Sequence, residues 1–223
     1  MDLKDLSSQF PNKTAFITGA ASGLGKAFAH LLATEGWRLH LADLDYSLLQ
    51  ETVEGFDLLH EVNCYQLDVS DFSTYTSVVE QVYMHSEKVD LLINNAGIGD
   101  GGLFQSYNML DWNNMLNINL LGTVYGCYLF TSRMIKAQSG LIINIGSAAG
   151  FMNAPGMSAY NVSKAAIYSF SETIFHELKS ENIKVSVVTP TFFKSNVMQQ
   201  AKGSDSVIAF AEKQMKYSTT NAD

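Results

Sequence analysis

Short apolar runs alternate with amphipathic segments along this 223-residue chain, and this order constrains the fold more than any other feature. Each run has the length of a strand, whereas the segments between them repeat apolar residues at helical spacing. Strands that alternate with helices in this way form a parallel sheet with helices on both faces. The sequence therefore predicts an α/β fold with a doubly wound parallel sheet, as a single domain over residues 1–223. The predicted strands are Lys13–Thr18, Arg38–Ala42, Asn63–Leu67, Val89–Ile93, Leu141–Ile145 and Ile183–Val188.

The composition excludes several classes of partner. The chain is acidic, with a formal net charge of -8 and no basic block, so we expect no nucleic-acid partner. No apolar run is long enough to span a bilayer, and the first residues contain no signal-peptide core. We therefore expect no membrane partner and a cytoplasmic location. Cys64 and Cys127 lack metal-ligand spacing, so we expect two reduced thiols and no metal site.

A glycine-rich turn joins the first strand to the first long helix. Its glycines are Gly19, Gly23 and Gly25, with Ser22 and Leu24 between them. Glycines let the backbone turn tightly and approach a pyrophosphate at a helix N-terminus, where N–H groups favour anions. The spacing is GxxxGxG rather than GxGxxG, and small residues can also serve packing alone. The turn indicates a dinucleotide site, with a purely structural turn as the alternative.

Asp43 ends the second predicted strand, twenty residues after Gly23. A carboxylate at this distance suits hydrogen bonds to an adenosine ribose, and it would repel a 2′-phosphate. Neither Ser22 nor Leu44 supplies a cation to neutralise such a phosphate. The sequence therefore favours NAD(H) over NADP(H). The alternative is that Asp43 caps the helix predicted over Tyr46–Gly55, although Asp45 could do this instead.

Amide side chains follow the fourth strand and recur in the helix predicted over Met109–Ala137. The turn Asn94–Gly97 suits a cofactor-facing position, although it is equally typical of a plain strand-to-loop turn. Asn119 lies in an otherwise apolar helical stretch, so it is either a structural hydrogen-bonding residue or part of a relay near the active site. Because residues 116–130 are apolar nearly all round, we expect a homo-oligomer through helices around 109–137 and 158–179.

The stretch Gly140–Lys164 contains three polar residues suited to proton transfer. Ser147 follows the fifth strand, at the sheet edge where open α/β folds bind ligands. Tyr160 and Lys164 lie four positions apart, so they share a face if a helix begins at Ser158. A phenol is a poor acid or base near neutral pH, and a nearby ammonium lowers its pKa. The stretch therefore predicts a proton-transfer site, although a Tyr and a Lys at this spacing are also common without any function.

Taken together, these motifs resemble the short-chain dehydrogenase/reductase family over about residues 13–195. The motifs are Thr18–Gly25, Asp68–Val69, Asn94–Gly97, Asn119, Ser147, Tyr160 and Lys164. The resemblance implies a Rossmann-like domain in which Tyr160 is the general acid/base. It also implies that Lys164 lowers the pKa of Tyr160 and holds the nicotinamide ribose, while Ser147 polarises the substrate oxygen. Asn119 would hold a relay water through its helix backbone.

The resemblance also implies the cofactor contacts. Gly19, Gly23 and Gly25, with Ser22 and Leu24, would shape the pyrophosphate turn. The remaining contacts would be Asp43 to the ribose, Asp68 and Val69 to the adenine, Asn95, Ala96 and Gly97 to the adenosine side, and Pro190, Phe193 and Ser195 to the carboxamide. Hydride transfer belongs to the nicotinamide itself.

The sequence departs from the family pattern near its end. Thr191 stands where the family usually has a glycine after the proline, which puts the carboxamide contacts in doubt, although Ser195 keeps a hydroxyl there. Family members commonly run on through another helix and strand, and we expect these to be missing after Asp223. We also expect residues 191–203 to form a substrate lid.

The substrate side is predicted to be apolar. Its expected walls are the loop Gly99–Tyr107 together with Phe151, Met152, Met157, Phe192, Phe193 and Met198. The sequence therefore predicts an NAD(H)-dependent oxidoreductase acting on a small hydrophobic alcohol or ketone. The alternatives are a cofactor-binding protein without turnover and an epimerase or dehydratase, for which the chain has no room for the usual sugar-nucleotide domain.

Overall fold

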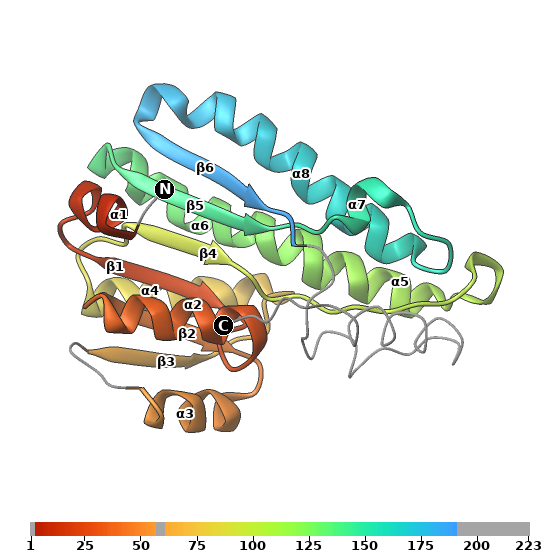
Figure 1. The fold of residues 1–223 in the computed structure, drawn as a ribbon, viewed down its shortest axis with the longest axis horizontal. Coiled ribbons are helices and arrows are strands. Elements are labelled where there is room, and N and C mark those ends of the chain that lie inside the picture. Colours follow the sequence, from red (N-terminus) through yellow and green to blue (C-terminus); the bar gives the residue numbers. More distant parts are fainter. Residues whose placement is uncertain (1–2, 57–60, 191–223) are drawn as a thin grey trace.

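The structure is a computed structural model that describes residues 3–56 and 61–190 of the chain (Figure 1). Its centre is a six-stranded parallel sheet with the order β3-β2-β1-β4-β5-β6, and all six predicted strands are present. The strands are β1 (Thr14–Thr18), β2 (Arg38–Asp43), β3 (Val62–Gln66), β4 (Leu91–Asn94), β5 (Gly140–Ile145) and β6 (Ile183–Val188).

Helices cover both faces of this sheet, as the alternating pattern predicts (Figure 1). The helices are α1 (Leu3–Gln9), α2 (Gly23–Thr34), α3 (Tyr46–Glu54), α4 (Phe72–His85), α5 (Met109–Leu116), α6 (Gly122–Ala137), α7 (Ala149–Met152) and α8 (Ser158–Leu178). Successive strand residues point to opposite faces. Thus Ala15 and Ile17 of β1 pack with α1, α2 and α3, whereas Phe16 packs with α4 and α6.

The strand order places the carboxyl ends of β1 and β4 at the point where the chain reverses its direction across the sheet. From β1 the chain first moves outward to β2 and β3, and it then returns to β4 on the other side of β1. The crossovers therefore diverge above these two strands, and open α/β sheets bind ligands in the crevice expected at such a point.

The predicted helix Met109–Ala137 contains a local irregularity. α5 passes through a π-helical turn, Asn117–Leu121, before it continues as α6. Such single π turns are frequent at functional sites. Asn119 lies within this turn, and its side chain bonds both main-chain groups of Ile98 in the loop after β4. The apolar pattern predicts a uniform helix here. The structure has a π turn instead, at the residue whose buried amide makes these two hydrogen bonds.

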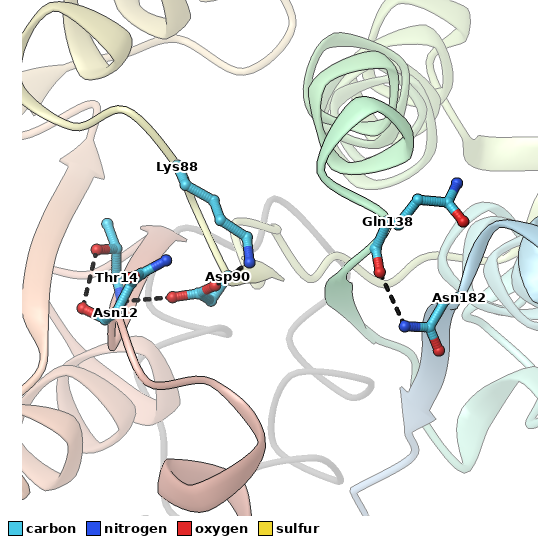
Figure 2. Close-up of polar contacts among 6 residues, drawn as sticks. All are labelled: Asn12, Thr14, Lys88, Asp90, Gln138 and Asn182. Carbon is cyan, nitrogen blue, oxygen red and sulfur yellow. Dashed lines mark hydrogen bonds and ion pairs between the residues drawn. The ribbon is translucent and has the colours of Figure 1, made fainter.

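The amino end of the sheet, on the opposite edge, is closed by local polar contacts (Figure 2). The fully buried Asp90 accepts a hydrogen bond from the Thr14 N–H at 3.2 Å and pairs with Lys88 at 3.0 Å. Nearby, the Asn182 amide donates to the Gln138 carbonyl at 2.8 Å. A cavity of about 490 Å³ opens here, beside Thr14, Lys88 and Arg133. It lies at the amino end of the sheet, away from the switch point at the carboxyl ends of β1 and β4.

Within the described residues, no helix combines the length and the apolarity needed to cross a bilayer.

Candidate active site

The glycine turn after β1 requires glycine at specific positions. Gly19 has φ 65° and Gly23 has φ 53°, in the left-handed region that L side chains rarely adopt. A Cβ on Gly25 would lie 2.1 Å from the Gly19 carbonyl oxygen, and one on Gly19 would lie 2.8 Å from the Ala96 Cα. The turn is therefore packed against itself and against the loop after β4, and added side chains would displace both.

The N-terminus of α2, which follows this turn, has no side-chain cap. Ser22 occupies the N-cap position in an extended conformation, without a capping hydrogen bond. The first turn of α2 contains no acidic residue. By contrast, α3, α4 and α5 are capped by Asp45, Asp71 and Asn108. The first N–H groups of α2 are thus not taken by a side-chain acceptor, which fits an anionic group such as a pyrophosphate.

Asp43 lies at the end of β2, beside the glycine turn. Its carboxylate accepts hydrogen bonds from the Ala21 N–H at 2.9 Å and the Asp45 N–H at 3.1 Å. Asp45 caps α3 by accepting from the Leu48 N–H at 3.0 Å, so the alternative role of Asp43 as that cap is wrong. Asp43 therefore holds the turn in place from a partly exposed position, and its contact with a ribose stays a prediction.

The loop after β4 is fastened to the glycine turn by two side chains. The Asn95 amide donates to the carbonyls of Thr18 at 2.9 Å and Gly19 at 3.0 Å. The Thr18 hydroxyl accepts from the N–H groups of Asn95 and Ala96, both at 3.0 Å. Asn95 thus connects the loop after β4 to the start of the glycine turn. Sequence reasoning missed Thr18 in this role, although its place directly before the glycines was a signal.

Asp68 and Val69, the predicted adenine contacts, differ in their surroundings. The exposed Asp68 accepts from the N–H of Ser70 at 2.9 Å and from its hydroxyl at 2.6 Å. Val69 is buried, and a Cβ on Gly122 would lie 2.8 Å from its Cγ2. Val69 is thus a core residue that packs against Gly122, and the adenine contacts stay a prediction.

Asn119 is buried and lies close to Lys164. A Cβ on Gly97 would lie 3.1 Å from the Asn119 Oδ1 and 3.6 Å from the Lys164 Nζ. The Asn119 side chain pairs with the Ile98 N–H at 2.8 Å and carbonyl at 2.9 Å. It therefore makes the structural hydrogen bonds that were one of its two predicted roles, and the relay stays a prediction. Gly97 thus marks the point where the loop after β4, the π turn and α8 meet.

Ser147, Tyr160 and Lys164 meet at the carboxyl end of β5. Helix α8 begins at Ser158 as predicted, which places Tyr160 and Lys164 on one face one turn apart. The Lys164 ammonium donates to the Ile145 carbonyl at 2.9 Å, two residues before Ser147, and lies 5.8 Å from the centre of the Tyr160 ring. The Ser147 hydroxyl is the polar neighbour that acts on the ionisation of Tyr160. The three predicted residues therefore converge.

Burial shifts both ionisable groups of this cluster. Burial raises the pKa of Tyr160, and the hydrogen bond with Ser147 acts in the opposite direction. Burial also lowers the pKa of Lys164 to about 8. Desolvation disfavours the phenolate and dominates the Tyr160 pKa in this structure, so the lowering by Lys164 stays a prediction. Near neutral pH the buried Tyr160 side chain is therefore a neutral phenol.

The loop predicted to face the substrate contains a buried acid that sequence reasoning did not single out. Asp100 is almost fully buried in the loop after β4, where it accepts from the Tyr107 hydroxyl at 3.0 Å. This loop is joined to the segment before α8 by a hydrogen bond from the Gly102 N–H to the Gly156 carbonyl at 2.6 Å. A single Asp within the Gly-rich loop was the available signal.

Only some of the apolar residues predicted to line the substrate side lie within the described part of the chain. Phe151 and Met152 are more than half exposed, at 55% and 65%, whereas Met157 is buried and pairs with Gly102. Pro190 is described, and its carbonyl accepts from the Ala148 N–H at 3.0 Å. The remaining predicted residues, Thr191, Phe192, Phe193, Ser195 and Met198, lie outside the described residues, as do the predicted lid and the end of the chain.

Comparisons with known proteins point in one direction. The short chain dehydrogenase family matches residues 13–206. The 3-oxoacyl-(acyl-carrier-protein) reductase FabG of Thermotoga maritima is 35% identical over 189 residues, which cover 84% of this chain and 77% of that protein. Carbonyl reductase family member 4 of Xenopus laevis is 30% identical over 191 residues, covering 86% and 80%.

Solved structures agree with these relatives. A short chain dehydrogenase/reductase from Burkholderia phymatum in complex with NAD superposes with a TM-score of 0.89 and 29% identity, covering 96% of this chain and 83% of that one. An NAD+-bound xylitol dehydrogenase gives a TM-score of 0.77 and 31% identity, covering 82% and 71%.

Proposed function

Because the chain belongs to the short-chain dehydrogenase family of oxidoreductases, we propose that it transfers hydride between NAD(H) and a small hydrophobic alcohol or ketone. The observation that carries this proposal is the convergence of Ser147, Tyr160 and Lys164 at the carboxyl end of β5, beside the crevice. When bound, the nicotinamide would supply or accept the hydride. The residues of the chain supply the proton and the orientation.

In the reducing direction, the Tyr160 phenol donates its proton to the oxygen that develops negative charge. The Ser147 hydroxyl donates a hydrogen bond to the same oxygen and so holds the carbonyl beside Tyr160. The Lys164 ammonium stabilises the phenolate that remains. In the oxidising direction, Tyr160 must first lose its proton, so oxidation should rise with pH while reduction should fall.

Several features support NAD(H) as the cofactor. The uncapped N-terminus of α2 and the tight glycine turn fit a pyrophosphate. Asp43 would accept hydrogen bonds from the adenosine ribose and repel a 2′-phosphate. The two solved relatives named above were determined with NAD, which supports the same preference. Lys164 would hold the nicotinamide ribose.

The test is NADH absorbance with a panel of alcohols and ketones, repeated with NADP(H). Replacing Tyr160 with Phe should lower kcat by about 10²- to 10⁴-fold and leave NAD binding intact, because only the proton donor is lost. Tyr168→Phe on the same helix is the matched control, since Tyr168 is partly exposed and packs on Phe151. A Tyr160→Phe variant near the wild-type rate would show that the acid/base assignment is wrong.

The cofactor preference has its own test. Asp43→Ala should relax the preference for NAD over NADP because it removes the repulsive carboxylate. Asp45→Ala is the matched control, since it removes the cap of α3 and costs about 1 kcal/mol of stability without touching the ribose position. Equal selectivity in wild type and Asp43→Ala would contradict the ribose role.

A cofactor-binding protein without turnover is the alternative. The presence of all four predicted catalytic residues, Asn119, Ser147, Tyr160 and Lys164, favours the enzyme. Binding of NADH without turnover of any compound in the panel would favour the alternative instead.

We also propose a homo-oligomer formed through α5–α6 and α8. Tyr128 on α6 is 71% exposed and lies beside Phe72 of α4, and Tyr125 packs on the same ring. On α8, Val162 and Phe175 are exposed as well. An apolar helix face that its own chain leaves uncovered is suited to association with a second copy. The cytoplasmic location expected from the sequence stays a separate prediction.

A further inference from the structure

Ser163 lies directly before Lys164 on α8, and its hydroxyl joins two residues of the active site. The side chain is fully buried. Its Oγ accepts a hydrogen bond from the Asn119 amide at 3.1 Å and donates one to the Tyr160 main-chain carbonyl at 2.8 Å. Both capacities of the hydroxyl, as acceptor and as donor, are therefore used within the site.

The Asn119 side chain is also fixed to the loop after β4, through both its oxygen and its nitrogen. Its Oδ1 accepts from the Ile98 N–H at 2.8 Å, and its amide donates to the Ile98 carbonyl at 2.9 Å. A continuous set of hydrogen bonds thus runs from the loop after β4, through the π turn, to the first turns of α8. Because every member is buried or partly buried, water cannot readily replace a missing partner.

We propose that Ser163 is a positioning residue, whose hydroxyl fixes the first turns of α8 so that Tyr160 and Lys164 stay aimed at the Ser147 side of the crevice. The inference depends on the proposed function, in which Tyr160 carries the proton. Ser163 acts through Tyr160 and Asn119 and contacts no reacting atom. Without the hydroxyl, the Tyr160 carbonyl loses its side-chain donor and the first turns of α8 lose their contact with Asn119, so the phenol samples orientations away from Ser147.

The same helix contains an equivalent arrangement outside the active site. The Asn144 amide donates to the Ser171 hydroxyl at 2.8 Å, and Ser171 donates to the Ile167 carbonyl at 2.7 Å. Ser171 is 2% exposed. The pattern of amide, hydroxyl and main-chain carbonyl is the same, but it connects α8 to Asn144, the penultimate residue of β5, two turns along the helix from Ser163. Ser171→Ala therefore removes matched hydrogen bonds without touching the acid/base.

The experiment compares Ser163→Ala, Ser163→Thr and Ser171→Ala in the full-length protein. Ser163→Ala should lower kcat by about 10-fold or more, leave the KM for NAD unchanged, and move the pH dependence of oxidation to higher pH. Ser163→Thr keeps the hydroxyl and should recover most of the rate. Ser171→Ala should lower the Tm but leave kcat and the pH profile unchanged.

Wild-type kcat and pH profile in Ser163→Ala would overturn the proposal, as would equal losses of kcat in Ser163→Ala and Ser171→Ala. Ser163→Cys keeps the size of the side chain and weakens its hydrogen bonds. It should give an intermediate kcat, and it provides the test if the other variants fail to fold.

If the wild type shows no turnover, the proposed function fails separately. The positioning role is then tested by ultraviolet titration of the Tyr160 phenolate, taken as the difference from Tyr160→Phe. Ser163→Ala should shift this titration, and no shift would overturn the proposal.

Discussion

His40 makes the stability of the protein depend on pH in a way that the structure quantifies. The ring is fully buried on β2, with Nδ1 2.9 Å from the Tyr65 hydroxyl and Nε2 2.8 Å from the Ser86 hydroxyl. Burial is the main cause that lowers the pKa of His40 from 6.5 to about 4, with smaller contributions from the charges of His85 and Arg38. Two neutral hydroxyls solvate the neutral ring well but do not compensate a buried imidazolium.

The sign follows from the lowered pKa. Between about pH 6.5 and about pH 4 the unfolded chain binds a proton at His40 that the folded protein excludes. The stabilisation is present above the unfolded pKa and is lost as the pH falls towards the folded one. The full shift corresponds to about 3 kcal/mol, of which about 2 kcal/mol is lost by about pH 5.

The assay is urea unfolding of wild type and His40→Gln at about pH 8 and about pH 5. Other groups contribute equally to both proteins, so the wild type should lose about 2 kcal/mol more than the variant. His176→Gln, on the exposed part of α8, is the control and should follow the wild type. An equal loss in wild type and His40→Gln would refute the reasoning.

Three further substitutions have defined outcomes. Gly25→Ala should weaken NAD binding by about 10-fold or more, because its Cβ would lie 2.1 Å from a carbonyl oxygen; Gly55→Ala, whose Cβ would lie 3.6 Å from its neighbour, should bind normally in the same calorimetric titration. Thr18→Val should lower the free energy of unfolding by about 1–3 kcal/mol, since two main-chain N–H groups lose their acceptor; an unchanged denaturation midpoint would contradict this role. Tyr128→Lys should dissociate the oligomer in light scattering, whereas Met84→Lys, also at an exposed apolar position, should not; a wild-type mass for Tyr128→Lys would remove this face from the interface.

The elements of this fold could be predicted because they depend on local information. Six strands, the helices between them and the start of α8 at Ser158 follow from periodicity and turn chemistry. Strand–helix alternation then leaves a parallel sheet as the solution. The spacing of Tyr160 and Lys164 needs only a helix to place both on one face.

The roles of individual polar residues could not be predicted in the same way. Asn95 suited a cofactor contact, but its amide hydrogens bind carbonyls 76 and 77 residues earlier. Asp43 and Asp45 were both plausible caps of α3, and only their observed partners distinguish them. The π turn at Asn119 interrupts a stretch whose apolar pattern predicts a regular helix.

The sequence by itself determined the sheet, its glycine turn and the candidate catalytic side chains, because each depends on neighbours a few positions away. The tertiary structure decided what these side chains touch. Ser163 meets Asn119 across 44 residues, and His40 meets Ser86 across 46. Burial, which raises the pKa of Tyr160 and lowers that of Lys164, is likewise set by packing of distant elements around β5. Local patterns specify elements, whereas hydrogen-bond partners and desolvation follow only from the way those elements pack.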